Sequence, residues 1–89
     1  MKVKLELFGA SREFSNKDHL EFIIKEKIEI KDFRKEIISY LNKNFKGNDS
    51  FKKIVETSAF CSEDNNIIDD NYKIVKDQKI AIIPPIGGG

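Results

Sequence analysis

Hydrophobic and polar residues alternate in the first part of the chain, in two stretches separated by a loop. Every second side chain is apolar in residues 3–7, and residues 20–24 repeat the pattern. A period of two is typical of a strand that buries one face. Gly9 breaks the first stretch and opens a loop to about Asp18, so the pattern predicts an antiparallel hairpin with a long connection.

The apolar period then changes to three and four residues, which predicts one long helix. This helix is expected to end at Gly47, where glycine can adopt a left-handed cap conformation. Its start has no favoured capping residue, since the preceding residue is Glu29. Ser50 is expected to cap a shorter second helix that runs through Val55. The stripe of the long helix consists of Ile30, Phe33, Ile37, Leu41 and Phe45.

Short strands and turns are predicted in the remainder of the chain. Residues 79–83 are rich in β-branched side chains at successive positions, which predicts a central strand with apolar residues on both faces. Pro84 and Pro85 end this strand, because proline cannot donate to a sheet ladder. The other predicted elements are a strand over 58–61, a polar turn over 63–66, an edge strand over 67–68 and a turn over 76–78.

The order of elements predicts the fold class. A hairpin, a long helix and returning strands are the layout of an α+β fold of the ubiquitin-like β-grasp type, with a mixed sheet and one main helix across one face. We expect this domain to cover residues 1–83, with residues 84–89 as an extended tail. Periodicity also permits a ferredoxin-like sandwich, but that fold needs two helices of similar weight, and here the second is weak.

Composition narrows the possible partners and the location. The 89 residues suffice for one domain, and 16 Lys and Arg against 15 Asp and Glu give a net charge of +1. We therefore expect no nucleic-acid partner. No signal peptide and no apolar run of about 20 residues is found, so no membrane role is expected. Cys61 is the single cysteine, which fits a protein of the reducing cytoplasm. His19 has no cysteine or carboxylate cluster near it at ligand spacing, so we expect no metal site.

The last residues of the sequence, Pro84-Pro85-Ile86-Gly87-Gly88-Gly89, carry the most specific chemistry. Two prolines favour an extended backbone. Three glycines lack side chains, so the segment can enter a channel that a Cβ atom would block. This pattern indicates that the carboxylate of Gly89 is presented to a partner. A frayed terminus and a purification scar are the alternatives. A frayed terminus explains less well why the glycines come last, after a strand and two prolines, and the segment does not have the sequence of a usual tag.

A carboxylate needs activation before it can transfer an acyl group. Reaction with ATP would convert it to an acyl-adenylate, and a sulfur nucleophile could then displace AMP and leave a thiocarboxylate. The sequence has no phosphate-binding glycine loop, since its other glycines are Gly9 and Gly47. We therefore expect a non-catalytic carrier with no bound cofactor, while ATP is used by the activating partner enzyme.

These features resemble the small subunit of molybdopterin synthase, the MoaD branch of the MoaD/ThiS sulfur carriers. The resemblance includes the first strand followed by Arg12-Glu13, the hydrophobic strand over 80–83, and the tail of Pro-Pro and terminal glycines. One departure is the stretch over 76–79, where the family often has Asp-Gly-Asp-Glu. It puts the local turn and a possible partner contact in question, and leaves the tail chemistry unaffected.

The resemblance implies a reaction cycle and two protein partners. An adenylating enzyme of the E1-like class would activate Gly89, and a sulfur donor would convert it to the thiocarboxylate. The tail would then enter the large subunit of molybdopterin synthase and give sulfur to the pterin precursor of the molybdenum cofactor. A heterotetramer with the large subunits at its centre is implied.

Contacts with a partner are expected from apolar residues near the tail. Phe8 is off the apolar face of the first strand, so it is expected either on the outer face of the sheet or in a small second core. Phe60 is a second candidate, with completion of the core as the alternative. Arg12 could pair with an acidic group or remain solvated. The predicted partner-binding set is Phe8, Arg12, Phe60, Ile82, Pro84, Pro85, Ile86, Gly87 and Gly88.

Other functions share the same tail chemistry. A carrier for thiamine or tRNA thiolation is the nearest alternative, although thiamine carriers are usually shorter and lack the two prolines. A ubiquitin-like protein modifier would use the same acyl-adenylate and join it to lysine side chains. A β-grasp interaction module with an inert tail is the alternative from another class.

Overall fold

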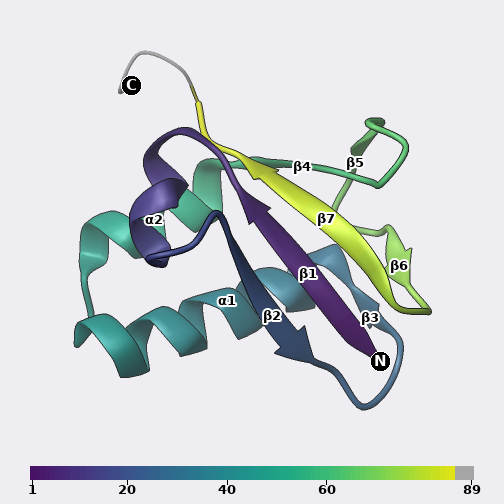
Figure 1. Cartoon of the computed structure of the whole chain (residues 1–89), viewed down its shortest axis with the longest axis horizontal. Coiled ribbons are helices and arrows are strands. Elements are labelled where there is room, and N and C mark those ends of the chain that lie inside the picture. Colours follow the sequence, from purple (N-terminus) through teal and green to yellow (C-terminus); the bar gives the residue numbers. More distant parts are fainter. Residues whose placement is uncertain (86–89) are drawn as a thin grey trace.

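The computed structural model describes residues 1–85 and contains a mixed sheet with two α-helices on one side (Figure 1). Within these residues the main sheet is five-stranded, with the order β2-β1-β7-β4-β5. Its strands are β1 (Lys2–Leu7), β2 (His19–Ile23), β4 (Ala59–Cys61), β5 (Ile67–Ile68) and β7 (Gln78–Ile83). The helices are α1 (Ile30–Phe45) and α2 (Asp49–Thr57), and a small second sheet pairs β3 (Ile28–Glu29) with β6 (Lys73–Ile74).

The strand pairing confirms the predicted β-grasp layout. β1 and β2 form the antiparallel hairpin, β7 lies parallel to β1, and β4 pairs antiparallel with β7. Leu5 lies opposite both Leu20 and Ile80, so three inward-facing residues of neighbouring strands are in one row. β7 is a central strand, as predicted, and β5 is at the edge. The small sheet of β3 and β6 is an element that the sequence analysis missed.

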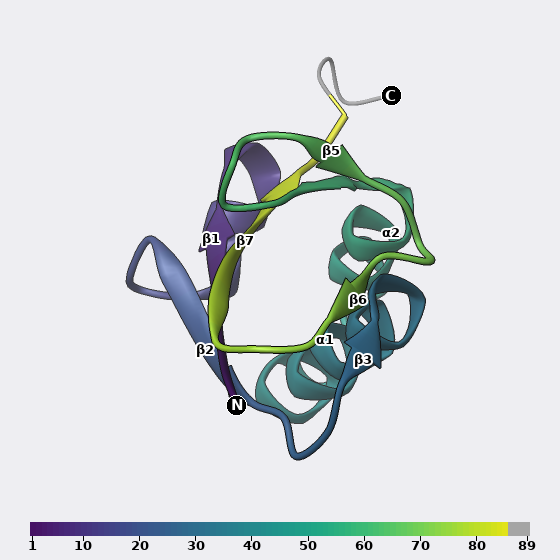
Figure 2. The same cartoon turned by 90° about the vertical axis from the view of Figure 1, so that its right-hand side faces the viewer.

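The core lies between the sheet and α1, and Figure 2 shows both helices on the same side of the sheet. Four of the five predicted stripe residues of α1 are buried there. Phe45 is the exception, because it is 36% exposed and packs edge-on against Phe51 of α2, with ring centroids 4.9 Å apart. The last stripe position therefore joins the two helices and does not fill the main core. The buried stripe residues are Ile30, Phe33, Ile37 and Leu41.

The start of α1 is capped by backbone from a distant segment. Glu29 makes no side-chain cap, as its residue type predicts. The amide N–H groups of Ile30 and Lys31 donate instead to the carbonyl oxygens of Tyr72 (3.0 Å) and Asp70 (3.1 Å). Two of the unpaired N–H groups at a helix start are thereby satisfied without a capping side chain.

Two other predicted helix ends are shifted. The left-handed conformation at the end of α1 begins at Lys46 (φ 53°) and continues in Gly47 (φ 74°), so the cap is one residue earlier than predicted. α2 is capped by Asn48, whose side chain accepts from the N–H of Phe51 at 3.1 Å. The prediction of Ser50 as the cap is therefore wrong, because asparagine two residues earlier serves equally well.

The loop after β1 is more ordered than predicted. Residues Gly9–Phe14 form a short 3-10 helix, η1. The buried hydroxyl of Ser11 donates to the carbonyl oxygen of Phe8 at 2.6 Å and accepts from the N–H of Phe8 at 3.0 Å. Phe14 is fully buried and contacts Phe51, with ring centroids 5.0 Å apart. This helix therefore connects the end of β1 to α2.

Arg34 connects α1 to the segments around it. Its guanidinium group donates to the carbonyl oxygens of Val55 (2.7 Å) and Ser58 (2.8 Å) and to a carboxylate oxygen of Asp70 (2.9 Å). It also lies over the ring of Phe60, 4.6 Å from the centroid. The end of α2 and the start of β4 are thus held in place from α1. In the part of the chain that the structure describes, no helix is long and apolar enough to cross a membrane.

Candidate functional site

The predicted reactive tail begins where β7 leaves the sheet. Ile83 is the last residue of β7, and Pro84 and Pro85 follow it. Pro84 is buried, and a Cβ atom placed on Gly9 would be 3.8 Å from its ring, so the loop after β1 packs against this proline. The start of the tail is therefore held by the domain, and Pro85 is exposed. The predicted residues Ile86, Gly87, Gly88 and Gly89 lie outside the described residues.

The alternation of β7 decides which of its side chains could meet a partner. Ile80 and Ile82 are fully buried towards the helices, so Ala81 and Ile83 face the outer side of the sheet. Ile83 is 36% exposed and lies opposite Ala59 of β4, which is also exposed. The last residues of the central strand therefore present apolar side chains on the outer face.

Neighbouring residues extend this apolar surface. Phe8 follows the last residue of β1 with extended backbone and is 45% exposed. Ile67 of β5 is 79% exposed and lies opposite Cys61, which in turn lies opposite Ala81. Several exposed apolar side chains grouped beside the tail are the kind of surface that marks a protein contact. We call it the tail-side patch, and it consists of Phe8, Ala59, Cys61, Ile67, Ala81 and Ile83.

Two of the predicted partner contacts are wrong. Phe60 and Ile82 are both fully buried in the core, so neither can contact a partner on the surface. The alternative given for Phe60, completion of the core, is what the structure shows. Ile82 was assigned to the wrong face by one residue, because in a strand a shift of one position moves a side chain to the opposite face. Ile83 occupies the place that was predicted for Ile82.

Other predicted residues are accessible. Phe8 is on the outer face, which was one of its two predicted positions. Arg12 of η1 is exposed and makes no ion pair within residues 1–85. Ala59, Ile67 and Ile83 were not among the predicted contacts. Strict alternation from Ile80 along β7 would have identified Ile83, whereas Ala59 and Ile67 depend on strand pairings that the sequence does not show.

Charged residues that are paired with one another lie elsewhere on the outer face, together with Ile23 of β2, which is 74% exposed. Lys79 lies 3.6 Å from Glu6, and Lys2 lies 3.7 Å from Glu21. The N–H of Lys79 also donates to a carboxylate oxygen of Glu63 at 2.8 Å. These contacts place ion pairs on the strands that lead away from the tail-side patch.

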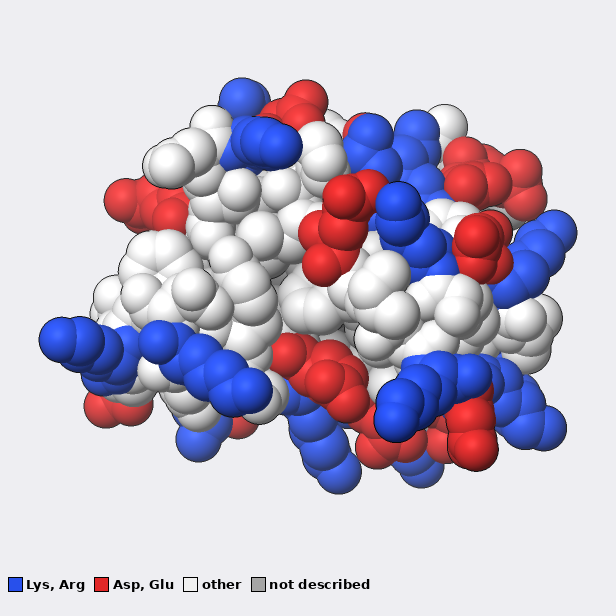
Figure 3. Space-filling model, turned by 60° about the horizontal axis from the view of Figure 1, so that its bottom comes forward, with Lys and Arg blue, Asp and Glu red and all other residues white. Residues whose placement is uncertain are grey.

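Charges of both signs cover the α1 side as well. Figure 3 shows this side, with basic and acidic side chains interspersed around white areas and no region of a single sign. This distribution agrees with the net charge of +1. One local effect lies at the start of β2, where a hydrogen bond of 2.9 Å from the His19 ring lowers the pKa of Asp18. No long-range field that would attract a polyanion follows from this arrangement.

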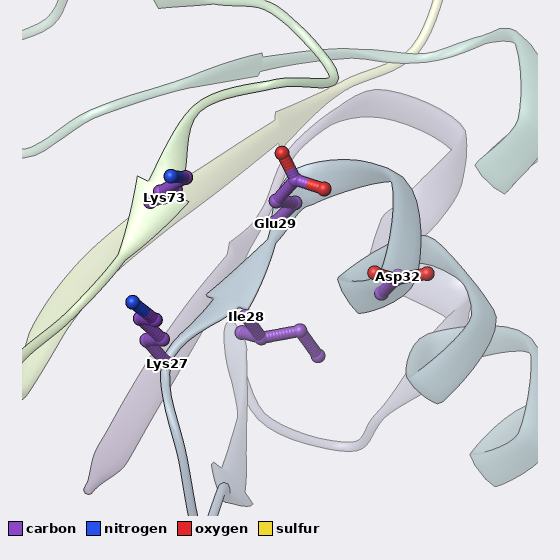
Figure 4. Close-up of a pocket in the computed structure, with 5 residues that line it drawn as sticks. All are labelled: Lys27, Ile28, Glu29, Asp32 and Lys73. Atoms are coloured by element: carbon purple, nitrogen blue, oxygen red, sulfur yellow. The ribbon is translucent and has the colours of Figure 1, made fainter.

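A hollow of about 350 Å³ lies at the other end of the molecule, between β3, β6 and the start of α1 (Figure 4). The amino groups of Lys27 and Lys73 lie on one side, and the carboxylates of Glu29 and Asp32 lie on the other. Lysines of α1 lie close to both carboxylates, with N–O distances of 3.4 Å and 3.6 Å. With its carboxylates paired and remote from Pro85, this hollow is not the site that the tail predicts.

Comparison with known proteins places the fold. The sequence matches no protein-family model and no curated protein. The structure is similar to a protein from Pyrococcus furiosus assigned as molybdopterin converting factor subunit 1, with a TM-score of 0.69 and 16% identity over 96% of this chain and 98% of that one. SAMP1 from Haloferax volcanii matches with a TM-score of 0.69 and 13% identity over the full length of both chains.

A third structure is a complex. It contains subunits 1 and 2 of the molybdopterin-converting factor from Helicobacter pylori, and it matches with a TM-score of 0.54 and 17% identity over the full length of both chains. At 13% to 17% identity these similarities show the fold. Residues 1–85 therefore have the ubiquitin-like β-grasp fold.

Proposed function

We propose that this protein is a sulfur carrier of the MoaD type, the small subunit of a molybdopterin synthase. The observation that supports it best is the placement of Pro84 and Pro85. A central β-grasp strand delivers them to an edge of the domain bordered by the tail-side patch, and the sequence continues into three glycines. An apolar docking surface next to a segment without side chains suits a partner that takes hold of the domain and receives its tail.

The chemistry proposed for the tail has two steps. An oxygen of the Gly89 carboxylate attacks the α-phosphorus of ATP, which forms the acyl-adenylate and releases pyrophosphate. A hydrosulfide equivalent then attacks the carbonyl carbon, the bond to the AMP oxygen breaks, and a thiocarboxylate and AMP remain. An enzyme of the E1-like class would supply the nucleotide site and the sulfur donor, so this domain acts as the substrate of both steps.

The proposed acceptor is the large subunit of molybdopterin synthase. The structure of the complex from Helicobacter pylori supports this choice, because its subunit 1 shares the fold of this chain and is bound there to subunit 2. We propose the same pairing here, within a heterotetramer. The thiocarboxylate sulfur would replace an oxygen group of the pterin precursor in the large subunit. Water would then hydrolyse the bond between the Gly89 carbonyl carbon and that sulfur, so that the carrier leaves with its carboxylate restored.

The test is an intact-mass measurement on the full chain after incubation with a cognate adenylating enzyme, ATP and a sulfur donor. We expect a gain in mass that corresponds to the exchange of one oxygen atom for one sulfur atom. Fragmentation in the mass spectrometer should locate this change at Gly89. Deletion of Gly88 and Gly89 should abolish the gain and leave the unfolding curve unchanged, since both residues follow the folded domain. An unmodified chain in the presence of an enzyme that is active on another carrier would refute the proposal.

Recovery of bound proteins separates the proposed pathway from its alternatives. Co-purification of a molybdopterin synthase large subunit supports the proposal, whereas recovery of a thiazole synthase or a tRNA-thiolating enzyme would assign the carrier to another pathway. A ubiquitin-like modifier would appear as an amide bond between Gly89 and lysine side chains of other proteins. The same acyl-adenylate leads to all of these products, so the acceptor decides among them.

A further inference from the structure

A groove of about 450 Å³ lies on the other side of the tail from the tail-side patch, between η1, α2 and the start of the tail. The patch is on the outer face of the sheet, whereas α2 lies on the side of the sheet that carries the helices (Figure 2). The start of the tail therefore has a hollow on one side and an apolar surface on the other. The groove is lined by Ala10, Ser50, Lys53, Ile54, Thr57, Pro84 and Pro85.

The walls of this groove are mainly apolar, and one lysine, unpaired in the described part of the chain, lines it. Ala10, Ile54 and the two prolines supply carbon surface. The hydroxyl of Thr57 donates to the carbonyl oxygen of Lys53 at 2.8 Å, so it is already satisfied within α2. Lys53 is the charged residue among those that line the groove, and it makes no ion pair within residues 1–85.

The groove lies close enough to the tail that a protein bound to the tail would also lie near the groove. Residues 86–89 can reach at most about 14 Å from Pro85 when fully extended. Under the proposed function the reacting group is at Gly89, so the partner must bring its reactive centre within that distance of a residue that lines the groove. A protein that encloses such a short segment comes close to the groove on one side of its base and to the tail-side patch on the other.

We propose that this groove is a second docking site for the acceptor protein, which inserts an apolar side chain there and places a carboxylate against Lys53. This inference rests on the proposed function and adds the chemistry of the partner surface. An apolar side chain would remove the carbon walls from water. A carboxylate gives a charge-assisted hydrogen bond with the unpaired ammonium group, whereas a basic group would be repelled by it.

Helix α2 offers a matched control for this proposal. Ser50, Lys53, Ile54 and Thr57 follow the spacing of one helix face and line the groove. Lys52 is the neighbouring lysine, is also exposed, and does not line it. Lys53→Glu and Lys52→Glu therefore make the same change in net charge on the same helix, one inside the groove and one beside it.

The experiment is calorimetric titration of the full chain with the large synthase subunit at physiological ionic strength. We expect Lys53→Glu to weaken binding about tenfold or more, and Lys52→Glu to change it less than about threefold. Ala10→Trp, which fills the groove from η1, should weaken binding to a similar extent as Lys53→Glu. Unfolding curves of all three variants should match that of the wild type, because the substituted side chains are exposed.

The outcomes distinguish the two proposals. Equal binding by Lys53→Glu and Lys52→Glu, or unchanged binding by Ala10→Trp, would overturn the groove as a docking site while the carrier function stands. A wild-type chain that neither binds the large subunit nor gains sulfur in the mass measurement would overturn the carrier function itself. If the wild type binds and the two groove variants alone are weakened, both proposals are supported.

Discussion

The outer face of the sheet has two ends that are built from the same central strands and differ in the side chains that they group together. At the end where the tail leaves, Phe8 and Ile83 are 45% and 36% exposed. At the other end, Lys2 pairs with Glu21 and its backbone N–H donates to Asp77 at 2.8 Å, and the exposed apolar side chain beside them is Ile23 of β2. Both ends are equally regular β-structure, so strand formation does not explain the difference.

The tail end groups exposed hydrophobic side chains together, whereas the far end mainly carries paired charges. Exposed paired charges are well solvated and contribute little to stability, so these side chains can remain in water at little cost. Exposed phenylalanine and isoleucine side chains gain free energy only when something covers them. The patch is therefore better explained by a contact with another protein than by a role in folding.

Two phenylalanines predicted as contacts provide the strongest test. Phe60→Ala should lower the free energy of unfolding by about 3–5 kcal/mol, because it leaves a cavity below Arg34 in the core. Phe8→Ala should change it by less than about 1 kcal/mol, because much of that ring is already in water. Urea unfolding of both variants measures the difference. Similar losses for the two would contradict the separation of core from patch.

A charge placed in the patch should disturb binding more than folding. Ile83→Asp should weaken the affinity for the large subunit about tenfold or more, equivalent to about 1.4 kcal/mol, because a carboxylate would be buried in an apolar contact. Lys4→Asp is the control, since Lys4 of β1 is exposed on the same outer face of the sheet but lies outside the patch. Calorimetric titration of both gives the comparison, and equal effects would remove the distinction between the two ends.

The ion pair at the far end should contribute little. Lys2→Ala removes the 3.7 Å contact with Glu21, and both side chains are at least half exposed. We expect the coupling free energy between the two residues to be below about 1 kcal/mol and to fall as salt is added. A double-mutant cycle with Glu21→Ala, measured by urea unfolding at two salt concentrations, gives this quantity. A larger value that does not depend on salt would be inconsistent with a solvated pair.

The smallest expected effect is on pH dependence. The hydrogen bond from His19 lowers the pKa of Asp18 below its ordinary value of 3.8. The stabilisation is therefore complete above this ordinary value and is lost as the pH falls through the lower pKa of the folded state. Asp18→Asn should show a shallower loss of stability below pH 3.8 than the wild type. Equal slopes for the two proteins would show that this carboxylate does not contribute.

Several features of the fold and the site could be predicted because they depend on local periodicity. The alternation over residues 3–7 placed β1, and the stripe from Ile30 to Leu41 placed α1 and its buried face. The two prolines marked the end of β7. In each case neighbouring residues along the chain supply the signal, so no knowledge of distant contacts is needed.

The failures share the opposite property. β3 and β6 are two residues each, which is too short for a periodic pattern, and they exist because the segments on either side bring them together. The backbone cap on α1 comes from Asp70 and Tyr72, about forty positions along the chain. The sequence did not decide whether Phe60 belongs to the core or to the surface, because its burial depends on Phe33 and Arg34 of a separate helix.

The order of the main elements, the core faces of β1 and α1 and the residue types of the tail follow from residue type and local spacing, so they could be predicted from the sequence. Which apolar residues remain outside the core depends on how the elements pack in three dimensions. Strand pairing and helix packing brought Phe8, Ala59 and Ile83 together on one side of Pro84 and the α2 groove to the other. Contacts between segments that are distant in the sequence determine which residues become neighbours, and local patterns carry no information about these contacts.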